Sequence, residues 1–193
     1  MNFDVQRLYR AVAEGSGLSV EESAHGLQDG EMLLAVETGK ITDQEFVDYV
    51  NKSKGLKWTL EDLIEVWEGM FSVNEAGYAI FTELKERGHP VHFLSNLAWH
   101  NMEAIRRQWP GFFDQSTENF FSYEMGFHKP DERIYRAVLE HLNAEAADCF
   151  FLDDKLENVE AAQDLGMNAH LFSSETVPVV MKSIQLFMEE KVV

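Results

Sequence analysis

The sequence has 193 residues and a formal net charge of −18, because 34 Asp and Glu side chains outnumber 16 Lys and Arg. Proteins that bind nucleic acid or anionic membranes through charge use clustered Lys and Arg, so this balance argues against both partners. With 45% hydrophobic residues and only 4 Pro, the chain can bury a core, and its length suits one domain or a domain with a small insert.

Several features predict a cytoplasmic protein. The N-terminal residues lack the apolar core of a signal peptide, and the single cysteine, Cys149, cannot form an internal disulfide. No apolar run approaches the roughly 18 residues that span a bilayer.

Residues 1–72 are predicted to form short helices without strands. Asp4 stands where the N-cap of the first helix is expected. Apolar residues recur at helical spacing in the later helices. Capping boxes, in which a Ser or Thr and a Glu three residues later exchange hydrogen bonds, are predicted for three pairs: Ser19 with Glu22, Thr42 with Glu45, and Ser72 with Glu75.

From Ala76 onward, helices alternate with short apolar runs. The predicted strands are residues 91–94, 120–121, 149–152 and 169–172, and the predicted helices include 101–108, 132–142, 157–165 and 179–191. This alternation predicts an α/β fold with a Rossmann-like parallel sheet covered by helices on both faces.

Ligands of open parallel sheets bind beyond the carboxyl ends of the strands. One predicted strand ends in Ser95-Asn96, whose hydroxyl and amide can donate hydrogen bonds to an anion. Another ends in Asp153-Asp154, a carboxylate pair that suits Mg²⁺, although one Asp could instead cap the following helix. Lys129, before Pro130, could meet an anionic group or be ordinary surface charge.

In combination, these segments resemble motifs of the haloacid dehalogenase-like (HAD) superfamily. The second motif is matched by Leu94-Ser95-Asn96, the third by Lys129-Pro130-Asp131, and the fourth by Phe151-Leu152-Asp153-Asp154. The resemblance implies a HAD-like core over residues 73–193 and a small all-α cap over residues 1–72, which closes over the substrate.

The resemblance also implies roles for single residues. Ser95 would hydrogen-bond the transferring phosphoryl group, and Asn96 would help to orient it. Lys129 would neutralise charge on the phosphoryl oxygens and the nucleophile. Asp154 would bind Mg²⁺, with Asp153 binding directly or through water. The acidic fourth motif is typical of the phosphatase branch of the superfamily.

The first motif of the family, an apolar strand ending in a nucleophilic Asp, has no match in the sequence. Asp4 is the only nearby carboxylate, and no apolar strand precedes it. Residues 1–10 resemble the stretch that follows this motif, so the central strand is expected just upstream of Met1. The alternative is a complete chain whose sheet is rearranged or borrows a strand from a second copy in a homodimer.

The resemblance therefore implies a HAD-like hydrolase whose complete form is a magnesium-dependent phosphatase. Its substrate would be a small phosphorylated metabolite such as a sugar phosphate, attacked through an aspartyl-phosphate intermediate. The recorded chain, without the nucleophile, is expected to be weakly active or inactive. The alternative is a catalytically silent binding or interaction protein. The genomic sequence upstream of Met1 would show whether the missing strand is encoded there, or whether the sheet is rearranged or borrows a strand from a second copy.

Overall fold

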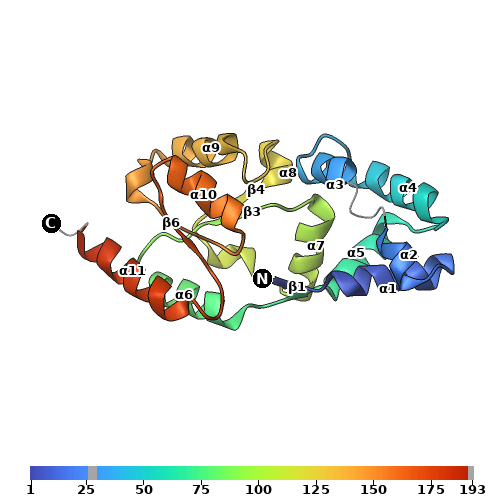
Figure 1. Ribbon diagram of the computed structural model, residues 1–193, viewed down its shortest axis with the longest axis horizontal. Coiled ribbons are helices and arrows are strands. Elements are labelled where there is room, and N and C mark those ends of the chain that lie inside the picture. The colour runs from blue at the N-terminus through green and yellow to red at the C-terminus, as the bar shows by residue number, and fades with distance from the viewer. Residues whose placement is uncertain (26–29, 191–193) are drawn as a thin grey trace.

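A computed structural model of the chain describes residues 1–25 and 30–190. Figure 1 shows a group of short helices on one side of the molecule, an α/β core on the other, and α7 between them. The first group, called here the cap helices, comprises α1 (Val5–Ser16), α2 (Val20–Ala24), α3 (Gly30–Glu37), α4 (Asp43–Lys54) and α5 (Leu60–Glu68).

The core follows the predicted alternation of helices and strands. Its strands are β3 (Phe93–Ser95), β4 (Asn119–Phe121), β5 (Phe150–Asp153) and β6 (Asn168–Leu171). Its helices are α6 (Glu75–Glu86), α7 (Trp99–Gln108), α8 (Ser122–Met125), α9 (Glu132–Leu142), α10 (Leu156–Asp164) and α11 (Val177–Glu190). The predicted end of the last helix at Lys191 lies outside the described residues.

Capping interactions fix the starts of several helices. The boxes at Ser19 and Thr42 are confirmed, with each hydroxyl accepting from the backbone N–H of the Glu three residues later at 3.2 Å. Asp4 caps α1 as predicted, accepting from the N–H of Gln6 at 3.0 Å. The predicted box at Ser72 is wrong: Asn74 caps α6 instead, and accepts from Gly77 at 3.0 Å.

The prediction that residues 1–72 contain no strand is also wrong. Asn2 and Phe3 form β1, which pairs antiparallel with β2 (Phe71–Ser72). Ser72 is therefore part of a strand and cannot cap the helix that follows. The ring of Phe3 lies 5.2 Å from that of Trp67, between centroids, which packs this ladder against α5.

The core strands form two parallel pairs that no strand of the described chain connects. β3 pairs with β4, and β5 pairs with β6. Figure 1 shows α9 and α10 on one side of the strands and α6 and α11 on the other. Leu94 and Phe151 pack in the cluster of α9 and α10, whereas Phe150 and Leu152 pack in the cluster of α6 and α11. Both faces of the strands are thus covered, as in an α/β layered fold.

A third buried cluster crosses from the cap helices into the core. It joins Val47 and Leu63 of the cap helices to Ala104 and Ile105 of α7. The division of the chain at residue 72 stays a prediction, because α7 shares its hydrophobic core with the cap helices. No helix in the described part of the chain is long and apolar enough to cross a membrane.

Candidate active site at the strand ends

The residues predicted from the second motif lie at the carboxyl end of β3. Ser95 ends the strand, and its hydroxyl makes no hydrogen bond within the described ranges. The Asn96 side chain instead binds the backbone of Lys129, accepting from its N–H and donating to its C=O, both at 2.9 Å. Its expected role in orienting a phosphoryl group stays a prediction. The loop that follows is held by Ser122, whose hydroxyl accepts from Leu97 N–H and donates to Leu97 C=O.

Lys129 is buried between the two strand pairs. Its Nζ donates to the carbonyl oxygen of Leu94 in β3 at 2.7 Å and to Oδ2 of Asp153 in β5 at 2.6 Å. The ammonium also lies 5.6 Å from the centre of the Phe151 ring. The structure therefore brings together the predicted Lys129 and Asp153, from segments 24 residues apart, at the carboxyl edge of the strands.

Asp153 and Asp154 differ sharply in environment. Asp153 is buried, and its Oδ1 accepts from Lys155 N–H and from Asn158 Nδ2 at 2.9 and 2.8 Å. Burial raises the pKa of Asp153, but the charge of Lys129 and these hydrogen bonds lower it below the ordinary value. Asp154 is exposed, so its carboxylate is the more available of the two to a cation.

Asn158 also belongs to this site, although no role was predicted for it. Its Nδ2 orients Asp153, and its Oδ1 is buried without a hydrogen-bond partner among the described residues. The available signal was its position five residues after Asp153, on the first turn of α10. A buried acceptor of this kind is costly unless a donor or a cation reaches it.

The N-terminal amino group lies near the same strand ends. Burial lowers the pKa of the Met1 amino group, and the nearby charge of Asp154 raises it. The amino group that precedes β1 therefore lies within electrostatic range of Asp154, the residue that follows β5.

The facing edges of β3 and β5 carry backbone groups that no strand of the described chain pairs. Phe93 donates its N–H to Glu118, so the backbone groups of Leu94 point away from β4. Asp153 accepts from Phe172, so the backbone groups of Leu152 point away from β6. At the carboxyl end, the Lys129 ammonium takes the Leu94 carbonyl that a neighbouring strand would otherwise occupy.

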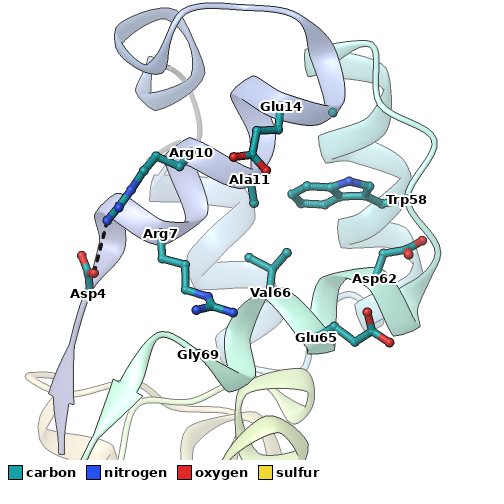
Figure 2. Close-up of a pocket in the computed structure, with 11 residues that line it drawn as sticks. Asp4, Arg7, Arg10, Ala11, Glu14, Trp58, Asp62, Glu65, Val66 and Gly69 are labelled. Carbon is teal, nitrogen blue, oxygen red and sulfur yellow. Dashed lines mark ion pairs between the residues drawn. The ribbon is translucent and has the colours of Figure 1, made fainter.

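A separate groove of about 800 Å³ lies between α1 and α5 (Figure 2). Trp58 and Val66 project into it, and Arg7 and Glu14 bring both signs of charge to its walls. None of the five predicted site residues lines this groove. It therefore lends no support to a phosphate site within the cap helices.

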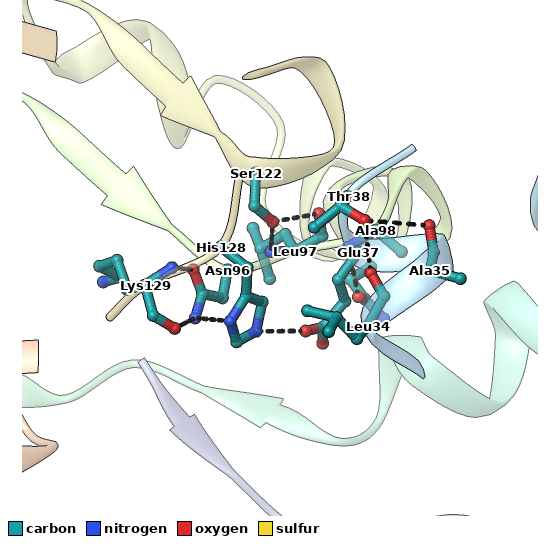
Figure 3. A network of polar contacts seen from close by, with 11 residues as sticks. Leu34, Ala35, Glu37, Thr38, Asn96, Leu97, Ala98, Ser122, His128 and Lys129 are labelled. Atoms are coloured by element: carbon teal, nitrogen blue, oxygen red, sulfur yellow. Dashed lines mark hydrogen bonds and ion pairs between the residues drawn. The ribbon is translucent and has the colours of Figure 1, made fainter. Parts of the chain in front are cut away.

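Two contacts between carboxylates and histidines join the cap helices to the core, and neither was predicted. Glu37 of α3 binds His128, the residue before Lys129 (Figure 3). Asp43 of α4 binds both the backbone N–H and Nδ1 of His100 in α7, at 2.9 and 2.5 Å. His128 is adjacent to the predicted lysine, but nothing in the sequence pairs it with a residue 91 positions away.

The Asp43 contact predicts an acid-labile link between the cap helices and α7. Burial raises the pKa of Asp43, but hydrogen bonds and charge from His100 lower it below the ordinary value of 3.8. A carboxyl whose folded pKa is lowered stabilises the fold above its unfolded pKa, and this stabilisation is lost as pH falls through the folded pKa. We therefore expect the free energy of unfolding, measured by urea titration, to fall less steeply below about pH 4 in Asp43→Asn than in the wild-type protein. Parallel pH profiles for the two proteins would contradict this assignment.

Comparison with known proteins identifies the family. A family model described as haloacid dehalogenase-like hydrolase matches residues 4–166. The chain belongs to the haloacid dehalogenase-like hydrolases. The structure agrees: a HAD family enzyme from Bacteroides thetaiotaomicron superposes with a TM-score of 0.79 at 23% identity, covering 90% of this chain and 88% of that one. A HAD-like hydrolase from Porphyromonas gingivalis also has a TM-score of 0.79, at 18% identity, covering 95% and 92%.

Several curated relatives of this HAD-like chain are phosphatases by name. A sesquiterpene phosphatase of Aspergillus oryzae is 35% identical over 103 residues, which are 50% of this chain and 49% of the relative. A D-ribitol-5-phosphate phosphatase of Bacteroides thetaiotaomicron is 21% identical over 136 residues, 68% of this chain and 66% of the relative. In both matches the chain spans less than two thirds of the relative's length.

Proposed function

We propose that the chain forms the cap and most of the catalytic core of a magnesium-dependent phosphatase that acts on a small phosphorylated metabolite. The buried ammonium of Lys129 is the observation that carries this proposal. It lies at the carboxyl edge of two strand pairs, where it donates to the carbonyl of Leu94, the residue before Ser95, and to the carboxylate of Asp153, the residue before Asp154. In a protein of net charge −18, such a fixed positive charge is where an anionic phosphoryl group would be held.

The residues present would divide the work by their chemistry. Ser95 would donate its hydroxyl proton to a phosphoryl oxygen, and Lys129 would offset the charge that develops there. Asp153, held by Lys129 and Asn158, would keep the ammonium oriented. The roles of Ser95 and Lys129 are those that the family resemblance implies, whereas the resemblance implies Mg²⁺ binding for Asp153.

Magnesium fits the donors at this edge. Mg²⁺ commonly takes one or two carboxylates and fills its remaining positions with water and phosphate oxygens. Asp154 would be its main side-chain ligand, with Asp153 beside it. In the described ranges, no group of three or more His, Cys, Asp or Glu side chains is arranged to hold a metal ion by itself, so water and phosphate oxygens would complete the coordination. When bound, the ion would offset negative charge on the phosphoryl oxygens. A neighbour from Bacteroides thetaiotaomicron was solved as a complex with magnesium and inorganic phosphate.

A nucleophilic Asp would have to come from a strand placed between β3 and β5. The N–H of Leu94 and the backbone groups of Leu152, which no strand of the described chain pairs, support a strand there, because backbone groups shielded from water need partners. The carboxyl end of a segment joined upstream of Met1 would lie within electrostatic range of Asp154, at the edge where the neighbouring strands also end. In the complete enzyme the Asp would attack phosphorus and form an aspartyl-phosphate.

The names of the relatives support an organic phosphate as the substrate. The relatives include a sesquiterpene phosphatase and a D-ribitol-5-phosphate phosphatase. The organic part of the phosphate ester is thus apolar in the name of one relative and a sugar alcohol in the name of the other. A sugar phosphate stays our proposal for the substrate.

The test is turnover of a generic aryl phosphate with Mg²⁺. We expect little or none from the 193-residue chain, and an increase of several orders of magnitude when it is extended by an upstream strand ending in Asp. The same extension ending in Asn is the matched control. Clear turnover by the 193-residue chain that Asp154→Asn abolishes would contradict the need for an added nucleophile.

The second candidate is a silent binding or interaction protein whose copies share a strand. The two unpaired strand edges favour it, because such edges readily accept a strand from another chain. It predicts a homodimer by light scattering, together with thermal stabilisation by phosphate or Mg²⁺ and no turnover after the strand is added. A monomer that gains turnover on extension would exclude it.

A further inference from the structure

A continuous set of hydrogen bonds joins the cap helix α3 to the backbone of Lys129 (Figure 3). Glu37 Oε2 lies 2.8 Å from His128 Nε2, and His128 Nδ1 lies 3.1 Å from Asn96 Nδ2. The side chains of Glu37 and His128 are only 15% and 25% exposed. The contact is therefore shielded from water where the cap helices meet the core.

The backbone of Lys129 fixes the orientation of the Asn96 amide. Asn96 Oδ1 accepts from the Lys129 N–H, and Asn96 Nδ2 donates to the Lys129 C=O. Turning the amide over would place donor against donor and acceptor against acceptor. The group that faces His128 is therefore Nδ2, which can only donate.

This orientation determines the tautomer of His128. Because Asn96 Nδ2 donates, Nδ1 of the neutral imidazole must accept, and the ring proton must sit on Nε2. Nε2–H then points at Glu37 Oε2, which accepts it. Each of these atoms is therefore either a donor or an acceptor. The carboxylate of Glu37 favours the His128 tautomer with its proton on Nε2, which leaves Nδ1 free to accept from Asn96.

We propose that Glu37 is a positioning residue, which fixes the Lys129 segment through His128 and Asn96 when the cap helices are docked. Docking would thereby align the Lys129 backbone, and with it the ammonium between Leu94 and Asp153. Its significance for catalysis rests on the proposed phosphatase function. Neither Glu37 nor His128 would touch the substrate.

The contact between Asp43 and His100 supplies a matched control. It also joins a cap carboxylate to a core histidine, but it ends in α7 and makes no bond to Asn96 or Lys129. A loss of general cap docking would follow from breaking either contact. A loss of Lys129 positioning should follow from breaking only the Glu37 contact.

The experiment is hydrogen exchange of the Lys129 backbone N–H, followed by NMR on the 193-residue protein. We expect Glu37→Ala to speed this exchange at least about tenfold, because the acceptor that orders His128 and Asn96 is lost. Glu37→Gln should largely restore the slow rate, since its amide oxygen still accepts from Nε2–H. Asp43→Asn should leave it near the wild-type rate. Unchanged exchange in Glu37→Ala, or equal acceleration in Asp43→Asn, would overturn the proposal.

A second measurement needs no variant. The ¹⁵N shifts of the neutral His128 ring distinguish a proton on Nε2 from one on Nδ1, and we expect Nε2. A proton on Nδ1 would overturn the proposal even if Glu37→Ala failed to fold. Both measurements are made without substrate, so an absence of turnover after strand extension would count against the phosphatase proposal alone.

Discussion

Replacing Lys129 with Met is expected to lower the free energy of unfolding by about 3 to 5 kcal/mol, measured by urea titration. The side chains of Lys129 and Asp153 are only 8% and 5% exposed, and their charged atoms lie 2.6 Å apart. Removing the ammonium leaves the Asp153 carboxylate buried without a counter-charge. It also removes the donor to the Leu94 carbonyl.

The double variant Lys129→Met/Asp153→Asn tests the cause. If Lys129→Met lowers the free energy of unfolding because the Asp153 carboxylate is left unpaired, neutralising Asp153 should recover part of that loss. The double variant should then lose less free energy of unfolding than the sum of the two single variants. Lys182→Met, at an exposed lysine, should change stability by less than about 0.5 kcal/mol. Additive losses at Lys129 and Asp153 would show that the pair is not coupled.

Gly39→Ala is expected to destabilise the protein by about 2 to 4 kcal/mol. Gly39 follows α3 and has a φ of +65°, where an L side chain is strained. An added Cβ would also lie 2.3 Å from the backbone oxygen of Tyr123 in the core. Because that neighbour is backbone, relief of the overlap requires the cap helices and the core to separate.

Gly55→Ala separates the two causes. Gly55 has a similar φ of +69°, but an added Cβ would meet nothing within 4 Å. We expect it to cost about 1 to 2 kcal/mol from backbone strain alone. The additional loss of unfolding free energy in Gly39→Ala, measured in the same urea titration, is then due to the close approach of the cap helices to the core. Equal losses at the two glycines would contradict that close approach.

The strand-end residues were predictable because parallel strands bring their carboxyl ends to one edge. Ser95 and Asp153 each end an apolar run, and the structure places Lys129 between their strands. The order of the elements was predictable from hydrophobic periodicity, because each helix and strand buries a regularly spaced set of side chains. The bounds shifted by a residue or two, as at β3, predicted over 91–94 and found at Phe93–Ser95.

Other features left no local pattern to detect. The ladder of β1 and β2 has two residues on each side, too few for an alternating pattern. The pairing of Glu37 with His128 depends on how α3 docks, which neither segment encodes alone. Asn158 was visible in the sequence, but its role depends on the geometry of the turn between β5 and α10.

The hydrophobic cluster that crosses from the cap helices into α7 limits how modular the protein can be. Removing residues 1–72 would uncover the buried Ala98, Ala104 and Ile105, which lose their packing partners in α4 and α5. Helices taken from a related protein would have to match this face of α7. Any exchange of the cap helices between related proteins therefore requires transplanting α7 together with them.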